Sequence, residues 1–191
     1  LFNTLSIVIR HIQFGELETS IKLIKETSKI LRSSLGKKKG TIPLDDEIEL
    51  LNAYIFIQQL HLKDRVEISL DVRKAYGNEI LEVPPLVIQP LVENAVMHGM
   101  SETTDGGKID IMIMEKADKV EVSVKDNGLG ISPEILEKVR SGSYEGHIGL
   151  LNVVERLRLI YDRDDVFSID SNKGEGTTVV LSLYKRREED V

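Results

Sequence analysis

The chain has 191 residues and contains no cysteine, so disulfide bonds and thiolate metal sites are excluded and the redox compartment is left open. Long hydrophobic runs are also missing. The longest run, residues 83–88, is far shorter than the roughly 20 apolar residues that cross a bilayer. No signal peptide is visible. Because the sequence opens on Leu1 in an already amphipathic pattern, we expect it to be a fragment of a longer protein.

Positive charge is scarce beyond the N-terminal region. Residues 1–40 carry eight Lys and Arg against three Asp and Glu, whereas residues 41–191 carry seventeen against twenty-nine. An acidic main domain argues against nucleic acid as the principal partner. The four histidines show no pair with metalloenzyme spacing, which gives no support to a histidine-based metal site.

The first 35 residues predict two helices joined by a turn at Phe14-Gly15. In the second helix, apolar residues recur with the spacing of a coiled-coil seam, at Ile21, Ile24, Leu31 and Leu35. A helical hairpin with such a stripe needs a partner surface. A second copy of the chain would give a dimeric four-helix bundle; the alternative is that the hairpin packs on its own chain.

The remaining pattern predicts an α+β domain with helices on one face of a mostly antiparallel sheet. A helix is expected from Pro43 to about Leu62, with Asp45, Asp46 and Glu47 complementing its dipole. A second helix is expected from Pro85 to about His98. Further helices are predicted from Ser132-Pro133, with Ser132 as N-cap, and from Leu150 to Tyr161. Strands are predicted at residues 66–72, 108–115, 119–125, 166–171 and 177–184. We divide the chain into a dimerisation hairpin (1–40), a connecting helix (41–65) and a catalytic domain (66–191).

Glu93 and Asn94 stand out because the helix around them is otherwise apolar. Adjacent polar residues in such a helix need solvent or a ligand. The side-chain oxygen of Asn94 is a suitable hard ligand for Mg²⁺. An isolated Glu-Asn pair is also compatible with a position on the helix surface, and this alternative stays open.

Asp126 ends a predicted strand and is followed by Asn127, Gly128, Gly130 and Ile131. Asp-Asn-Gly is common in turns between strands, but here a helix start follows at once. The second glycine suggests a backbone that passes close to a flat ligand. A carboxylate at this point can accept a hydrogen bond from an exocyclic amine and so distinguish adenine from guanine.

Glycines also precede the helix that begins near Leu150. Gly146 and Gly149 flank His147, and a helix N-terminus with free N–H groups attracts phosphates. Taken alone this glycine pattern is weak. Residues 141–148 read as a lid over such a site, and the turn 173–176 leads into Thr177.

In this order, the segments around Asn94, Asp126, Gly149 and Thr177 resemble the conserved boxes of the ATP-binding superfamily of histidine kinases, gyrase, heat-shock chaperones and MutL, which share the Bergerat fold. The resemblance covers about residues 66–184. It implies an ATP–Mg²⁺ site, with Glu93 and Asn94 as the catalytic pair and Asn94 as the metal ligand. The nucleotide-binding residues that it implies are Asn94, His98, Asp126, Gly128, Gly130, Ile131, His147, Gly149, Leu150 and Thr177.

The residue four positions before Asn94 is Pro90, where ATP-hydrolysing relatives carry a glutamate that activates water. Proline cannot act as a base, and Glu93 points about 100° away from Asn94 around the helix. The resemblance therefore implies transfer to a protein group rather than hydrolysis. Met97 stands where many relatives have a phosphate-binding lysine, so we expect His98, His147 or a lid residue to supply positive charge.

Residues 89–99 also resemble LytS/YesM-type sensor histidine kinases, as do residues 54–58. In that family the phosphate acceptor precedes a Leu-Phe-Asn-Thr-Leu segment, which here is residues 1–5. The resemblance implies an acceptor histidine two residues before Leu1, a homodimer, a response regulator receiver domain as partner, and a cytoplasmic location behind a membrane-embedded N-terminal region. Two alternatives stay open: a regulatory module that binds nucleotide without phosphotransfer, and a serine-kinase anti-sigma factor, against which residues 1–35 speak.

Overall fold

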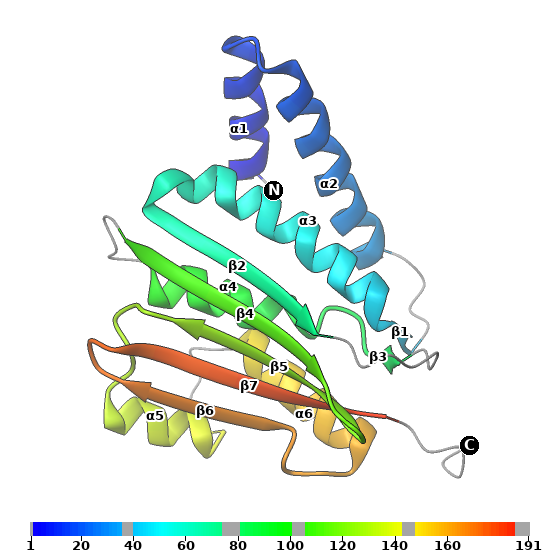
Figure 1. The fold of residues 1–191 in the computed structure, drawn as a ribbon, viewed down its shortest axis with the longest axis vertical. Coiled ribbons are helices and arrows are strands. Elements are labelled where there is room, and N and C mark those ends of the chain that lie inside the picture. Colours follow the sequence, from blue (N-terminus) through cyan, green and yellow to red (C-terminus); the bar gives the residue numbers. More distant parts are fainter. Residues whose placement is uncertain (1, 36–39, 74–80, 101–105, 143–147, 186–191) are drawn as a thin grey trace.

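The computed structural model describes residues 2–35, 40–73, 81–100, 106–142 and 148–185. Within these ranges, no helix combines the length and apolar character needed to cross a bilayer. A helical hairpin stands at one end of the molecule, and a sheet covered by helices forms the rest (Figure 1).

The two N-terminal helices are α1 (Phe2–Gln13) and α2 (Leu17–Leu35), as the sequence predicted. Gly15 makes the turn between them with a φ of 79°, which glycine adopts without steric cost. Its N–H donates to the carbonyl oxygen of Ile12 at 3.0 Å. The hairpin is thus closed by a single tight turn.

Helix α3 (Leu44–Leu62) lies between the hairpin and the sheet. On one side Ile57 packs with Ile7, Val8 and Leu23 of the hairpin. On the other side α3 contributes to the main core through the buried side chains of Leu44, Leu51, Tyr54 and Ile55. A helix that is apolar on two sides is one that is buried between two layers.

The main sheet has five strands in the order β2-β4-β5-β7-β6. Only the β2–β4 pair is parallel, and the other three pairs are antiparallel. The mostly antiparallel sheet predicted from the sequence is confirmed. The strands are β2 (Val66–Arg73), β4 (Gly107–Glu115), β5 (Lys119–Asp126), β6 (Phe167–Asn172) and β7 (Gly176–Tyr184).

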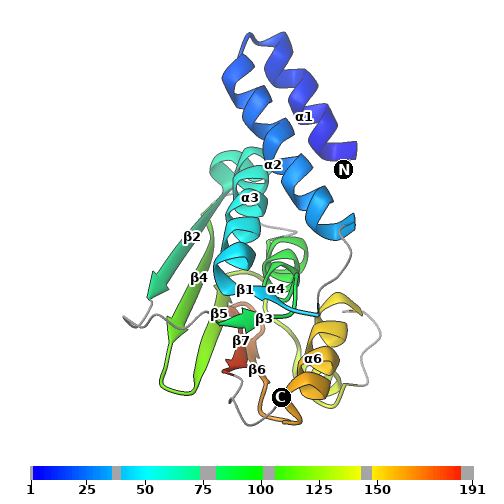
Figure 2. The ribbon, with the colours of Figure 1, turned by 90° about the vertical axis from the view of Figure 1, so that its right-hand side faces the viewer.

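Helices cover one face of this sheet, as Figure 2 shows from the side. They are α4 (Gln89–Asn94), α5 (Pro133–Arg140) and α6 (Ile148–Tyr161), with α3 beside β2. Alternate strand residues such as Ile111 and Val122 are buried under the helices. On the opposite face lie polar residues such as Lys119 and Glu121, which form an ion pair at 3.0 Å. The alternation fits a half-buried sheet.

One local prediction was wrong, and one element was not predicted. The helix expected from Pro85 begins only at Gln89, and its last turn, Ala95–Gly99, is a π-helix. A second small sheet that the sequence did not predict pairs β1 (Ile42–Pro43) with β3 (Glu82–Val83). Ser132 occupies the N-cap position of α5, as predicted, although its side chain makes no capping hydrogen bond.

Candidate functional site

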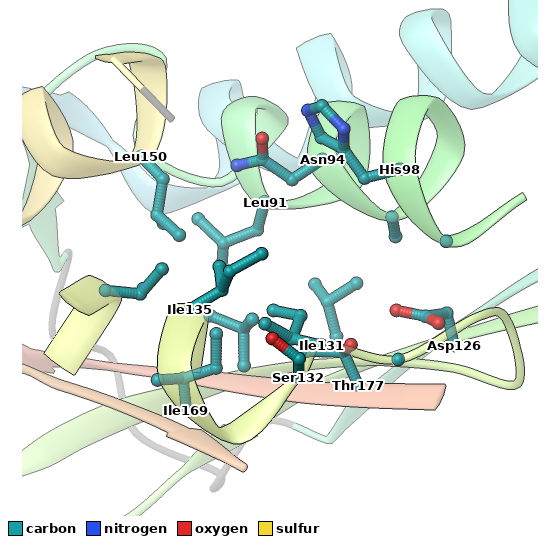
Figure 3. Close-up of a pocket in the computed structure, with 16 residues that line it drawn as sticks. Leu91, Asn94, His98, Asp126, Ile131, Ser132, Ile135, Leu150, Ile169 and Thr177 are labelled. Atoms are coloured by element: carbon teal, nitrogen blue, oxygen red, sulfur yellow. The ribbon is translucent and has the colours of Figure 1, made fainter. Parts of the chain in front are cut away.

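A cavity of about 800 Å³, including its open mouth, lies between the sheet and the helices that cover it. Figure 3 shows Asn94 and His98 projecting from the same helix above it, with Ser132 and Thr177 below. Asp126 stands at one end and Leu150 at the other. The cavity therefore joins segments that lie more than 80 residues apart in the sequence.

Most residues predicted to bind a ligand meet at this cavity. Its lining includes Asn94, His98, Asp126, Gly130, Ile131, Leu150 and Thr177. Of the described candidates, Glu93, Gly128 and Gly149 do not line it. His147 and most of the expected lid, residues 143–147, lie outside the described residues.

Asp126, the last residue of β5, is buried at 5% exposure. Burial raises the pKa of its carboxyl, while backbone hydrogen bonds from Gly128 and Thr177 act in the opposite direction. The N–H of Gly128 donates to its Oδ1 at 2.9 Å. Since two carboxylate oxygens offer about four acceptor positions, the side chain retains capacity to accept an N–H from a ligand.

Three glycines pack directly around Asp126. A Cβ atom on Gly99 would lie 2.8 Å from the Asp126 carboxyl, and one on Gly176 would lie 2.0 Å from its carbonyl oxygen. A Cβ on Gly128 would lie 1.9 Å from the carbonyl oxygen of Gly99. At Gly128 the absence of a side chain is thus required by contact with the chain itself, and the nucleotide contact that the resemblance implied for this residue stays a prediction.

Two polar side chains hold the loop that follows Asp126. The Asn127 side chain accepts from the N–H of Lys108 at 2.7 Å and donates to the carbonyl of Gly106 at 3.1 Å. Ser171 Oγ accepts from the N–H of Ile131 at 2.9 Å and lies 2.9 Å from Thr177 Oγ1. Ser171 was not predicted as a site residue, yet its hydroxyl links the loop at Ile131 to Thr177 of β7.

The π-helical turn Ala95–Gly99 shapes the opposite wall. The N–H of Met100 donates to the carbonyl of Ala95 at 3.1 Å, and the Gly99 carbonyl accepts from the N–H of Leu129 at 3.3 Å. The wider turn brings Gly99 against the loop after β5. Single π-turns occur frequently at functional sites.

Much of the cavity wall is apolar and was not predicted from the sequence. Helix α5 contributes Ile135 and Val139, and the strands contribute Val124, Ile169 and Val179. These residues carry the ordinary helix and strand periodicity of a core, so no sequence signal separates them from residues packed only against protein. An apolar slot with one buried carboxylate at its end suits a flat ligand that carries an amine.

Glu93 faces a different environment from Asn94. The Gln89 side chain donates to Glu93 Oε1 at 2.7 Å. Burial raises the pKa of the Tyr54 hydroxyl on α3, and the charge of Glu93 raises it further. Glu93 therefore faces α3 and does not line the cavity, and its place in the catalytic pair stays a prediction.

Comparison with family models accounts for nearly the whole chain. Residues 84–187 match the family described as "Histidine kinase-, DNA gyrase B-, and HSP90-like ATPase". Residues 1–66 match the family described as "Histidine kinase". The cavity lies within the first match, and the hairpin with α3 lies within the second.

Curated relatives agree. The chain is 32% identical over 194 residues to the sensor histidine kinase/phosphatase LytS of Staphylococcus aureus strain MRSA252, which covers 98% of the chain. It is 33% identical over 163 residues to the sensor histidine kinase YpdA of Escherichia coli strain K12, covering 84% of the chain. The chain spans only about a third of the length of these relatives, 32% and 28%.

Among solved structures, the histidine kinase domain from the Erythrobacter litoralis EL346 blue-light activated histidine kinase superposes with a TM-score of 0.58. The match covers 94% of this chain and 82% of that domain at 17% identity, so it supports the fold alone. Fold, motif order and relatives converge. The chain belongs to the histidine kinase-, DNA gyrase B- and HSP90-like ATPase family, within its branch of LytS-type sensor histidine kinases.

Proposed function

We propose that the cavity binds ATP with the adenine in the apolar slot and its amino group on the carboxylate of Asp126. The observation that carries this proposal is the burial of Asp126 at the end of a slot whose far wall holds Asn94. A buried acceptor that meets a donor only when the correct base is bound discriminates strongly between bases. Gly130 and Ile131 border the base, and Leu150 and Thr177 border the phosphate side.

The residues present also suit Mg²⁺ as a partner of the phosphates. Asn94 offers an amide oxygen at the cavity wall, and none of the described residues that line the cavity is a lysine or arginine. The described residues contain no group of three His, Asp or Glu side chains able to hold a metal by themselves. Mg²⁺ usually keeps one or two protein ligands and takes the rest from phosphate and water, so Asn94 is sufficient as its protein ligand. When bound, the ion neutralises phosphate charge.

The reaction we propose is transfer of the γ-phosphoryl group to a histidine two residues upstream of Leu1, followed by transfer to an aspartate on a response regulator receiver domain. The family membership and the match of residues 1–66 to the histidine kinase model support it. Pro90 lies in the first turn of α4, where hydrolysing relatives are expected to have their base. The site thus positions ATP for a protein acceptor.

The hairpin supports a homodimer. Its inner side packs on α3, while the predicted seam is exposed: Ile21 is 53% exposed and Ile24 is 50% exposed. The hairpin therefore has one side that packs on its own chain and another side that is free to pack on a second copy. We propose that the outer seam pairs with a second copy, and that the whole assembly is the cytoplasmic part of a protein anchored in the cell membrane through a region upstream.

Calorimetric titration with a non-hydrolysable ATP analogue and Mg²⁺ tests the site. Wild-type protein is expected to bind, and Asp126→Asn is expected to bind at least about tenfold more weakly because the acceptor that faces the adenine amine is replaced. Asp118→Asn, at the exposed turn before β5, is the matched control. Equal binding by the wild type and Asp126→Asn would show that the base lies elsewhere.

Phosphotransfer is tested in the chain extended by its natural upstream residues. Incubation with ATP labelled at the γ-phosphate is expected to give an acid-labile, base-stable phosphoprotein. Label that is acid-stable, or absent while nucleotide binds, would contradict transfer to histidine.

A further inference from the structure

Glu47 is a fully buried carboxylate outside the cavity, with 1% exposure. The sequence suggested that it complements the dipole of α3. Instead, its side chain crosses to the loop before α4, where Oε2 accepts from the N–H of Leu86 at 2.8 Å. Oε1 accepts from the N–H of Val87 at 2.8 Å and from that of Ile88 at 3.0 Å.

These three bonds explain why α4 begins late. Residues 86–88 direct their N–H groups to Glu47, and Leu86 adopts a φ of 56°, a left-handed conformation that is unusual for leucine. Helix α4 then starts at Gln89 with no side-chain cap of its own. One carboxylate on α3 thus fixes the point and direction from which the Asn94 helix departs.

Arg156 on α6 holds the same loop from the other side. Its Nη2 donates to the carbonyl of Pro85 at 2.8 Å. Burial raises the pKa of the Glu47 carboxyl, while the three backbone N–H groups and the charge of Arg156 lower it. The loop 85–88 is therefore hydrogen-bonded to Glu47 of α3 and to Arg156 of α6. Helix α6 also carries Leu150, at the proposed phosphate side of the cavity.

A further contact anchors the start of the loop. Strand β3 pairs with β1, directly before α3, and the N–H of Leu44 donates to the carbonyl of Leu81 at 2.8 Å. Segment 81–88 thus follows the first turns of α3 closely. The same helix packs against the hairpin through Ile57.

From this geometry we propose that Glu47 and Arg156 form a clamp on the loop 85–88 that positions the Asn94 helix and couples the nucleotide cavity to α3 and the hairpin. Glu47 is a positioning residue, since it does not line the cavity. The proposal rests on the proposed nucleotide site. A movement of α3 against the sheet changes the start of α4, and nucleotide binding in turn restrains α3 through the same bonds.

The first test is nucleotide affinity of Glu47→Gln, measured by titration with the non-hydrolysable ATP analogue and Mg²⁺. A glutamine has one acceptor oxygen where glutamate has two, so one of the three buried N–H groups loses its partner. We expect affinity to fall by about tenfold, as for one unmade buried hydrogen bond to a charged group. Asp46→Asn, an exposed neighbour with the same charge change, is expected to stay within about twofold of the wild type.

The second test separates positioning from a purely structural role. Amide hydrogen exchange of α3 and of residues 86–88 is followed with and without saturating nucleotide. In the wild type, nucleotide is expected to slow exchange in both segments. In Glu47→Gln at saturation, the protection of α3 is expected to be lost although the cavity is occupied.

Arg156 provides an independent pair of variants if Glu47→Gln does not fold. Arg156→Lys keeps a cationic donor for the Pro85 carbonyl and is expected to retain most of the affinity, whereas Arg156→Gln is expected to lose it. Equal affinities in wild type, Glu47→Gln and Arg156→Gln, or protection of α3 that survives in both variants, would overturn the clamp alone. A wild-type chain that binds no nucleotide would overturn the proposed function and the clamp's role with it.

Discussion

The sheet domain and the helical hairpin cover their apolar side chains in different ways. Among the described residues, the large apolar side chains that remain exposed are concentrated in the hairpin: Leu5, Ile9, Ile12, Phe14, Leu17, Ile21, Ile24 and Leu31. The rest of the described chain exposes only Met97, Leu129 and Leu159. The domain that holds the cavity is therefore complete in one chain, whereas the hairpin has an uncovered apolar face of the kind that marks an interaction surface.

The largest effect is expected when the packing inside the sheet domain is disrupted. Gly128→Ala places a Cβ 1.9 Å from the Gly99 carbonyl oxygen, which only backbone movement relieves. We expect a loss of about 3 kcal/mol or more in the free energy of unfolding, together with loss of nucleotide binding. Urea unfolding and calorimetry measure the two effects. Gly40→Ala, with no atom within 4 Å of the added Cβ, is the control. Near-equal stability of the two variants would contradict the packing described here.

The inner side of the hairpin is tested by Leu23→Ala. Leu23 is fully buried against Ile57 of α3, so its truncation leaves a cavity and should cost about 3 kcal/mol in the free energy of unfolding. Leu159→Ala, at an 86% exposed position of α6, is expected to cost less than about 1 kcal/mol. Similar losses in urea unfolding of both variants would show that the hairpin does not dock on α3 as described.

The outer side of the hairpin is tested by Ile24→Asp. A charge on the exposed seam is expected to weaken self-association by at least about tenfold while nucleotide affinity stays unchanged. Sedimentation velocity over a range of concentrations measures the first effect, and calorimetry the second. An unchanged dimer would place the interface elsewhere, and a monomeric wild type would contradict the homodimer.

The smallest effect is expected at Asp165, on the surface of the sheet domain and outside the lining of the cavity. Two N–H donors of Arg163, at 2.8 and 3.0 Å, and the hydroxyl of Tyr184 at 2.7 Å hold the pKa of Asp165 well below its ordinary value. A depressed carboxyl pKa stabilises the fold above the unfolded pKa of about 4 and loses that contribution as the pH falls. Asp165→Asn should lower Tm slightly at pH 7 and by less at pH 3, with nucleotide binding unchanged. A difference in Tm that does not shrink with acid would contradict this ion pair.

Most elements were readable because their periodicity is regular. The alternation in β4 and β5 and the spacing in α2 gave their positions within a few residues. The apolar run before Gln89 was read as helix because nothing in its own residues shows that Glu47, about 40 positions earlier, takes its N–H groups. A carboxylate in the first turn of a helix has the same sequence signature whether it faces solvent or a distant loop.

The polar residues and glycines of the site could be predicted from the sequence, but the contacts that shape its walls could not. Asp126, Asn94 and Thr177 line one cavity, as expected from their order in the chain. The apolar walls at Ile135 and Val179 and the buried hydroxyl of Ser171 follow from tertiary packing, which no local pattern encodes. The role of Glu93 depends on which side of α4 faces α3, and this became visible only with the helix in place.

The glycines around Asp126 have a consequence for selectivity. The N–H of Gly128 holds the carboxyl of Asp126 at 2.9 Å, and Gly99 packs so close to it that an added Cβ would lie 2.8 Å from the carboxyl. The entropy of fixing this side chain is therefore lost once, when the protein folds, and not again at each encounter with a purine. In the proposed function, an acceptor that is held in place before the ligand arrives distinguishes bases by geometry: a base that presents a donor at that point is accepted, and one that presents an acceptor is not.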